Sequence, residues 1–243
     1  MMKILLKILV FSFLGFQSLF ANDVNDGFIE YKKGNLHKAL EIFEIACESG
    51  AYAGCYNAGL MYYNGKGIDQ NYVKASSNFT KACEEGHDAA CYNLAYMYQN
   101  ALGVRQDFTK VVDLYKKTCE NKIGTACYNL AIMYKTEDGV IKDSFKEVEY
   151  LTKACELGHS KACYSLAIKF NREDGVEKNP LKAAQLYQKS CDLGYKYACY
   201  NLGVMYFEGK FFAKNLEEAE KLFKKACEMN LEDSCKAYKN LNK

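Results

Sequence analysis

The sequence predicts an all-α solenoid in which helical hairpins of 36 residues stack one on another. Two observations support this: twelve cysteines recur with a fixed period, and an amphipathic helical pattern recurs with them. A fixed period of this length is typical of repeat proteins, whose units contact only their neighbours. The cysteines form six pairs, each eight positions apart: Cys47 and Cys55, Cys83 and Cys91, Cys119 and Cys127, Cys155 and Cys163, Cys191 and Cys199, and Cys227 and Cys235.

In each repeat, the first helix is predicted to begin at an Asn or Asp that stands twelve residues before the first cysteine. Such a residue caps a helix because its side chain accepts a hydrogen bond from a backbone N–H that otherwise has no partner. Apolar or small residues follow at the spacing i, i+3, i+4, i+7, which forms one face of an amphipathic helix. The predicted caps are Asn35, Asn71, Asp107, Asp143, Asn179 and Asn215.

The second helix of each repeat is predicted to follow a break three residues beyond the first cysteine. Glycine stands at this break in four repeats, as at Gly50, and suits a left-handed helix end, whereas Lys122 and Asn230 replace it in the other two. An apolar row with helical spacing comes next, so each repeat is predicted to be helix, turn, helix and turn. In the second repeat this row is Cys91, Leu94, Ala95 and Tyr98.

Residues 1–21 have the three-part layout of a secretory signal peptide. Lys3 and Lys7 supply positive charge, residues 8–16 are apolar, and Ala21 precedes a polar segment. We expect cleavage after Ala21, and an uncleaved N-terminal anchor is the alternative. Residues 22–243 then form a single solenoid of six Cys-x7-Cys units, which we expect to be secreted or periplasmic, with no membrane span after cleavage.

The cysteine spacing predicts six disulfides, one within each hairpin. Residues eight positions apart on one continuous helix would lie roughly 12 Å apart, whereas a disulfide needs Cα atoms about 4.4–6.8 Å apart. The helix must therefore break between the two cysteines of a pair. Zinc fits less well, because seven intervening residues is not a usual ligand spacing and only three histidines are present. Pairing in another register, such as Cys55 with Cys83, remains an alternative.

Charge and composition restrict the possible partners. After the leader, basic and acidic side chains are equal in number and no basic run occurs, which gives no electrostatic case for nucleic acid or an anionic membrane as a partner. So many thiols would be unusual in a reducing cytosol unless they held metal. The sequence predicts no cofactor and no metal site, and we expect a monomer. His87 and His159 fall at the same position of two repeats, where we expect solvated side chains.

The repeated columns resemble the Sel1-like repeat family, a relative of the tetratricopeptide repeat. The resemblance lies in the sequences at 90–98, Gly103-Val104 and 81–84. Paired cysteines in every unit make the chain similar to the secreted Helicobacter cysteine-rich proteins. The resemblance implies a right-handed α/α superhelix with one disulfide per repeat, secretion, and interaction with host or other proteins. It also implies penicillin binding with weak β-lactamase activity, which is attributed to some members.

The sequence lacks the common catalytic motifs that would support an enzymatic function. The sequence lacks the Ser-x-x-Lys, Ser-Asp-Asn and Lys-Thr-Gly motifs of serine β-lactamases, the Gly-x-Ser-x-Gly elbow, and the His-Glu-x-x-His run of zinc proteases. With the cysteines assigned to disulfides, no nucleophile and no catalytic residue is predicted. Binding and slow hydrolysis of a β-lactam or a muropeptide-like molecule is therefore an alternative that rests on the resemblance alone.

A binding face has more support. A tyrosine and then an asparagine follow the second cysteine in most repeats, and asparagine can hydrogen-bond both N–H and C=O of an extended peptide. We expect this face of the second helices to line the concave surface and to bind a protein or peptide. A role in helix–helix contact is the alternative, and a lysine column that includes Lys74 is expected to be a solvated face. The predicted ligand-binding residues are Asn57, Tyr92, Asn93, Tyr128, Asn129 and Asn201.

Overall fold

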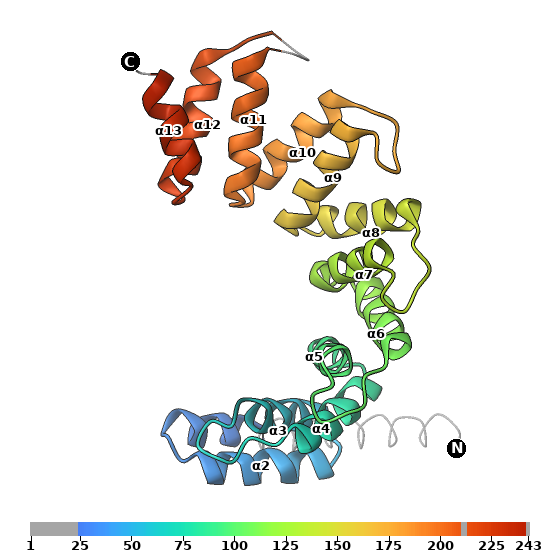
Figure 1. Cartoon of the computed structure of the whole chain (residues 1–243). Helices are drawn as coiled ribbons and strands as arrows, with labels where there is room; N and C mark the ends of the chain where they lie inside the picture. Colours follow the sequence, from blue (N-terminus) through green and yellow to red (C-terminus); the bar gives the residue numbers. More distant parts are fainter. Residues whose placement is uncertain (1–23, 210–212, 242–243) are drawn as a thin grey trace, which may run out of the picture. The chain divides into compact units, whose positions relative to one another are not determined.

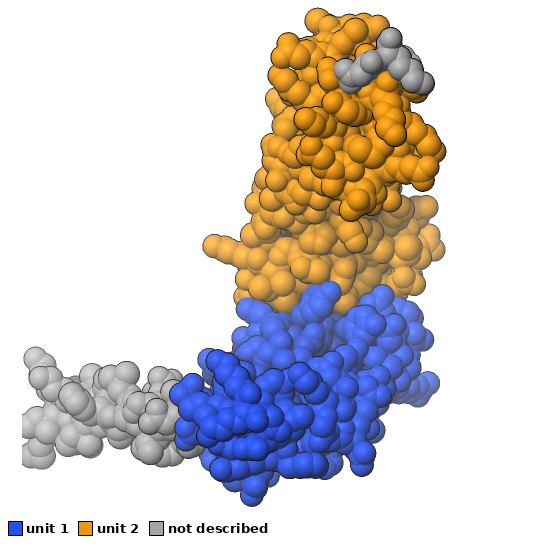
Figure 2. Space-filling view, turned by 90° about the vertical axis from the view of Figure 1, so that its left-hand side faces the viewer, with its two compact units in different colours: residues 1–114 blue, residues 115–243 orange. Residues whose placement is uncertain are grey.

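A computed structural model describes residues 24–209 and 213–241, and all regular structure in these ranges is helical. The predicted signal peptide, residues 1–21, lies outside the described residues. The chain divides after Leu114, inside α6, into two compact units (Figure 2). The helices of each unit are described separately below.

Unit 1 begins with helical residues 24–32. These are followed by α2 (Leu36–Glu48), α3 (Tyr52–Asn64), α4 (Tyr72–Glu84), α5 (Asp88–Gln99) and the start of α6 (Phe108–Glu120). Unit 2 contains the end of α6 and then α7 (Gly124–Thr136), α8 (Ser144–Glu156), α9 (Ser160–Arg172), α10 (Pro180–Asp192), α11 (Lys196–Glu208), α12 (Leu216–Glu228) and α13 (Glu232–Leu241).

Six repeats are formed by successive pairs of helices, from α2–α3 as repeat 1 to α12–α13 as repeat 6. Within each unit, helices that are consecutive in the chain pack side by side (Figure 1). Small side chains allow this close approach: Ala46, Ala82 and Ala154, one residue before the first cysteine of their repeats, are fully buried. In each unit the core therefore lies between neighbouring helices, as expected when single repeats cannot bury their apolar faces alone.

The predicted caps are confirmed in five repeats. Asn71, for example, accepts a hydrogen bond from the backbone N–H of Lys74, and Asp143 accepts two, from the first turn of α8. Asp107, Asn179 and Asn215 act in the same way. Asn35 is the N-cap residue of α2, as predicted, but its side chain makes no capping hydrogen bond. Its Nδ2 donates instead to Glu30 of the preceding helix, at 2.8 Å.

The break between the two helices of a repeat is a Schellman turn in all six repeats. In repeat 1, the N–H of Gly50 bonds to the carbonyl of Cys47, and the N–H of Ala51 bonds to the carbonyl of Ala46. Lys122 and Asn230, which replace the glycine, adopt the same left-handed conformation, with φ of 67° and 61°. The repeat geometry therefore imposes this backbone conformation even where the residue is not glycine.

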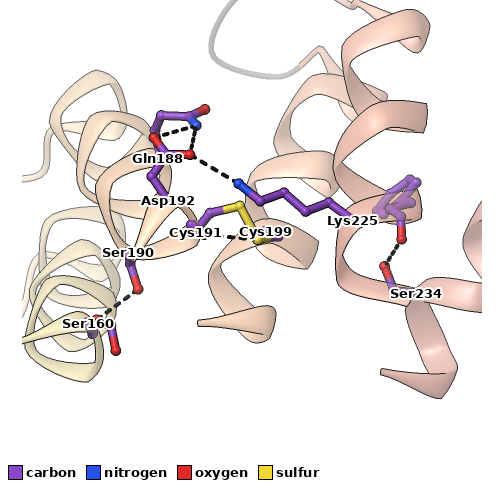
Figure 3. Close-up of a disulfide and its surroundings, with 9 residues drawn as sticks. Ser160, Gln188, Ser190, Cys191, Asp192, Cys199, Lys225 and Ser234 are labelled. Atoms are coloured by element: carbon purple, nitrogen blue, oxygen red, sulfur yellow. Dashed lines mark hydrogen bonds and ion pairs between the residues drawn. A yellow bond between two sulfur atoms is a disulfide. The ribbon is translucent and has the colours of Figure 1, made fainter. Parts of the chain in front are cut away.

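Each of these turns is closed by a disulfide. The six bonds join the cysteines within each hairpin, with Cα–Cα distances of 4.5–4.7 Å, and no cysteine is left over. This is the pairing that the spacing predicts, and the shifted register does not occur. Figure 3 shows Cys191–Cys199 between α10 and α11. The predicted fold class, a solenoid of helical repeats with one disulfide in each, is confirmed.

Polar contacts join neighbouring repeats in unit 2. In α10, Ser190 stands one residue before the first cysteine, at the position that is alanine in repeats 1, 2 and 4. Its hydroxyl donates to the carbonyl of Ser160 in α9 at 2.8 Å (Figure 3). Lys225 of α12 reaches Asp192 of α10 at 3.1 Å. Because the hydroxyl of Ser190 is fully buried, this bond satisfies a group that would otherwise destabilise the stack.

Candidate functional site

The tyrosines that follow the second cysteine pack between neighbouring repeats. Tyr56 of α3 stacks on His87 of repeat 2, with 4.2 Å between ring centroids, and Tyr128 of α7 stacks on His159 of repeat 4 at 4.4 Å. Aromatic pairs at such distances contribute about 0.5–1.5 kcal/mol beyond their burial. These tyrosines therefore have a structural role, which is the alternative that the sequence leaves open.

The expectation of solvated histidines is wrong. His87 and His159 are half-buried, and each caps the second helix of its repeat by accepting a backbone hydrogen bond on Nδ1. Burial lowers the pKa of both side chains from the ordinary value of 6.5. The sequence alone misses this role because it does not show that the turn lies against the tyrosine of the preceding repeat.

Two of the predicted asparagines bond within the protein. Asn57 donates from Nδ2 to the carbonyl of Ala53 on its own helix at 2.7 Å. Asn201 donates from Nδ2 to the hydroxyl of Tyr164 in the preceding repeat at 3.3 Å, and it also bonds to Tyr187. Burial raises the pKa of Tyr187 to about 12, and the bond from Asn201 partly offsets this effect. Asn201 therefore links repeats 4 and 5.

The other predicted site residues occupy the equivalent face of their helices. Tyr92 and Asn93 are half-buried on α5, and Asn129 lies beside Tyr128, also half-buried, on α7. Beyond this face, Tyr96 of α5 is 43% exposed and hydrogen-bonds to Tyr63 of the preceding repeat. Ligand binding by these residues remains a prediction.

A pocket of about 210 Å³ opens beside Asn57 in unit 1. Asn64 also lines it, two turns further along α3, and donates from Nδ2 to the carbonyl of Leu60. Each amide uses one N–H on its own helix and keeps its carbonyl oxygen and its second N–H for a ligand. Lys66 is the charged residue of the lining. The remaining lining residues are Phe28, Tyr31, Phe43, Leu60 and Met61.

Sequence reasoning finds only Asn57 of this pocket. Phe28 and Tyr31 belong to helical residues 24–32, which precede the first cysteine pair and have no counterpart in the periodic columns. Lys66 lies in the turn after α3, where its ammonium is 5.1 Å from the centroid of the Tyr31 ring. Aromatic residues just before the first repeat are the feature of the sequence that could have indicated this pocket.

The lysine column is exposed but does not form a simple solvated face. The ammonium of Lys74 lies 4.8 Å from the centroid of the Tyr62 ring and 3.1 Å from its hydroxyl. The same contact between neighbouring repeats recurs for Lys110 with Tyr98, Lys146 with Tyr134, and Lys182 with Phe170. Such cation–π pairs stabilise exposed sites by about 0.5–1 kcal/mol. This column therefore helps to join the repeats.

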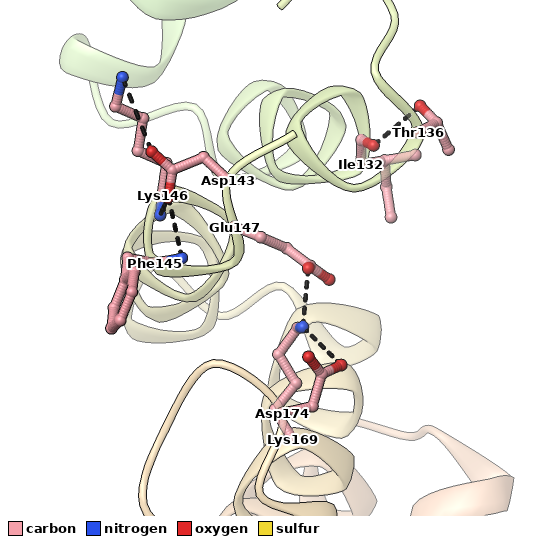
Figure 4. A network of polar contacts seen from close by, with 8 residues as sticks. All are labelled: Ile132, Thr136, Asp143, Phe145, Lys146, Glu147, Lys169 and Asp174. Carbon is pink, nitrogen blue, oxygen red and sulfur yellow. Dashed lines mark hydrogen bonds and ion pairs between the residues drawn. The ribbon is translucent and has the colours of Figure 1, made fainter. Parts of the chain in front are cut away.

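Repeat 4 contains a buried ion pair. Glu147 of α8 and Lys169 of α9 are 5% exposed each, and their side chains meet at 2.7 Å (Figure 4). Asp174 lies 2.9 Å from the same ammonium and is exposed. Glu147 and Lys169 are paired with each other, and Lys169 also with Asp174, so neither buried charge is left without a partner.

Three further pockets among the described residues contain none of the predicted binding residues. A groove of about 750 Å³ is lined by α10, α11 and residues 213–215, but none of the predicted binding residues lies in it. Within residues 24–209 and 213–241, no group of three His, Cys, Asp or Glu side chains could hold a metal ion. None of the helices in these ranges has the length and apolar character needed to cross a membrane.

Comparison with known proteins identifies a family. The model of the Sel1 repeat matches residues 26–50, 53–87, 88–122, 124–159, 160–195 and 196–231. The Helicobacter pylori proteins HcpC and HcpD, whose names carry a provisional β-lactamase label, are each 39% identical to this chain over 44 residues. These matches cover 18% of this chain and only 15% of HcpC and 14% of HcpD.

Two solved structures are similar over most of the chain. The protective antigen c5321 of uropathogenic Escherichia coli has a TM-score of 0.85 and 22% identity, over 93% of this chain and 49% of that one. A Sel1 repeat protein from Oxalobacter formigenes has a TM-score of 0.75 and 26% identity, over 87% of this chain and 86% of that one. The first likeness shows the fold alone.

Proposed function

Because this chain belongs to the Sel1 repeat family, whose fold is typical of protein–protein interaction, we propose that it binds a protein or peptide through the exposed face of its second helices. The observation that carries this proposal is the pocket beside Asn57. It combines apolar walls with two asparagine amides that keep hydrogen-bonding capacity. This mixture suits one apolar side chain of a peptide, together with the backbone amides that flank it.

The size of the pocket sets the class of ligand. Pockets that enclose drug-sized molecules usually measure about 300–1,000 Å³, and the pocket beside Asn57 measures about 210 Å³. It is therefore smaller than a pocket for a drug-sized molecule, but it can hold a single side chain. Lys66 adds a positive charge at its edge, which favours a peptide with a carboxylate near the anchoring residue.

We place this activity outside the cytoplasm. Six disulfides persist in an oxidising compartment and would be reduced in most cytosols. The leader-like residues 1–21 support export, and the concave surface is where we expect the ligand to lie. Fractionation of cells, with the protein detected in periplasm and medium, tests this part of the proposal. Recovery only from the cytosol in a reduced form would contradict it.

Selection from a random peptide library on the oxidised full-length protein tests binding. Asn64→Ala should weaken binding of the selected peptides about fivefold, because it removes an amide and its hydrogen bond from the pocket. Asn100→Ala is the matched control: Asn100 stands 36 residues later and bonds to its own helix in the same way, but does not line the pocket. Equal loss in both variants, or no selected peptide, would contradict the proposal.

The β-lactam alternative is tested in the same preparation. Its support is the label of HcpC and HcpD, whose similarity covers less than a fifth of this chain. Turnover of nitrocefin by oxidised protein, with contaminating β-lactamase excluded by a mock purification, would favour the alternative. We expect no turnover and no thermal shift with penicillin.

A further inference from the structure

One position of each repeat belongs to both helices. It ends the Schellman turn of the first helix, and it is also the N-cap of the second. The residues at this position are Ala51, His87, Ile123, His159, Tyr195 and Leu231. Two of the six are therefore titratable near neutral pH.

Each histidine accepts a backbone hydrogen bond on Nδ1, which must be unprotonated to do so. His87 Nδ1 accepts from the N–H of Ala90 at 3.2 Å, and His159 Nδ1 accepts from the N–H of Ala162 at 3.2 Å. The same N–H groups also bond to the backbone carbonyls of the histidines. An acceptor nitrogen carries no proton, so protonation would place a second donor against each N–H.

The rings cannot turn away without breaking a second contact. His87 stacks on Tyr56 at 4.2 Å and meets the edge of Tyr52 at 5.9 Å, both from α3 of the preceding repeat. His159 stacks on Tyr128 of α7 at 4.4 Å. A rotation that removed the new donor from the N–H would disturb these stacks. The cap and the junction with the preceding repeat therefore depend on the same neutral ring.

The charged groups near the two rings differ. A hydrogen bond of His87 with its own backbone, and after it Asp88 on the same helix, favour the protonated form of His87, whereas Lys161, on the same helix as His159, opposes protonation. From the preceding repeats, the contacting side chains are the tyrosines named above, which are neutral near pH 7. Burial is the largest influence on both histidines and lowers the pKa of each.

We propose that His87 and His159 make two junctions of the solenoid acid-labile: that between repeats 1 and 2, and that between repeats 3 and 4. The inference goes beyond the proposed function and holds whether or not the second helices bind a peptide. Above pH 6.5, the ordinary pKa of histidine, each neutral ring contributes its full stabilisation. This stabilisation is lost as the pH falls through the lowered pKa of the folded protein.

Amide exchange of the oxidised full chain tests the proposal by NMR. Between about pH 7.5 and about pH 5, which span the ordinary histidine pKa, the protection factors of the Ala90 and Ala162 N–H groups should fall about fivefold, as for a lost N-cap. The Ala198 N–H, which follows Tyr195 at the equivalent position, is the internal control and should not change. An equal fall at Ala198, or no fall at Ala90 and Ala162, would overturn the proposal.

Variants separate the two junctions. His159→Tyr, which introduces the residue of repeat 5, should abolish the response at Ala162 and leave that at Ala90. His37→Asn is the control, because His37 is exposed, and should change neither. If His159→Tyr does not fold, imidazole titration of the native chain decides: both pKa values must lie below 6.5, and Lys161→Ala must raise that of His159 alone. A value at or above 6.5 contradicts the proposal.

Discussion

Repeats 2 and 4 share one backbone plan but differ in the chemistry of their cores. In repeat 2, Ala75 of α4 and Met97 of α5 are fully buried. The corresponding residues of repeat 4 are Glu147 and Lys169, which are almost as deeply buried and form an ion pair (Figure 4). The solenoid therefore accepts a polar core in one repeat, provided that both positions change together.

The difference follows from the free energy of burying charge. A single buried charge loses its hydration without compensation, whereas a close pair recovers part of that loss by mutual attraction. Lys169 has a second partner in Asp174, which lies at the edge of the repeat and remains in contact with water. Repeat 4 thus needs two complementary residues where repeat 2 needs only apolar volume.

Breaking the pair should have the largest effect. Lys169→Met, which introduces the residue of repeat 2, leaves Glu147 buried without a partner and should lower the free energy of unfolding by about 3–5 kcal/mol. Urea-induced unfolding of the oxidised protein, followed by circular dichroism, measures the change.

The double variant Glu147→Ala/Lys169→Met is the control for this prediction. It gives repeat 4 the core of repeat 2 and should be as stable as the native protein, or more stable by about 1–4 kcal/mol. If the double variant is as unstable as Lys169→Met, the ion pair is not the reason for the difference between the repeats.

The disulfides should contribute equally in both repeats. Cys83→Ser/Cys91→Ser and Cys155→Ser/Cys163→Ser each open a loop of the same length and should each lower the free energy of unfolding by about 2.5 kcal/mol. Parallel urea titrations measure this. A loss confined to one repeat would show that the surrounding core, and not loop closure, determines the contribution.

The helix caps should give the smallest effect. Asn71→Ala in repeat 2 and Asp143→Ala in repeat 4 each remove a side-chain acceptor and should cost about 1 kcal/mol. The loss should be larger for Asp143, which accepts two N–H bonds and places a negative charge at the helix start. Thermal unfolding measures both. Equal losses would show that the second bond of Asp143 contributes nothing.

Local sequence patterns were sufficient to predict the role of a side chain where its partner lies within the same hairpin. Asn71 and Asp143 bond to N–H groups two or three residues away, so their roles can be predicted from position alone. The side chain of Asn35 instead donates to Glu30, from the helix before the first repeat, and makes no capping bond. The stacking of His87 on Tyr56 likewise joins two repeats, and no local pattern contains it.

The candidate site could be predicted only in part for the same reason. Asn57 is visible as one member of a periodic column, but Phe28 and Tyr31 of its pocket lie outside the period. The substitutions at Glu147 and Lys169 are also visible in the sequence. That they form a pair becomes clear only when the two columns are seen to face each other.

The sequence by itself determined the repeat length, because the cysteine pairs recur every 36 residues. It also determined the helical hairpins, because caps and breaks depend on residues only a few positions apart. It favoured a disulfide within each hairpin, and the structure excluded the shifted register. The tertiary structure decided which side chains meet between helices and between repeats: Asn201 with Tyr164, the histidines with their tyrosines, and Lys169 with Glu147. These contacts join residues that the period places in separate columns, and only the packing of one helix on the next brings them within reach.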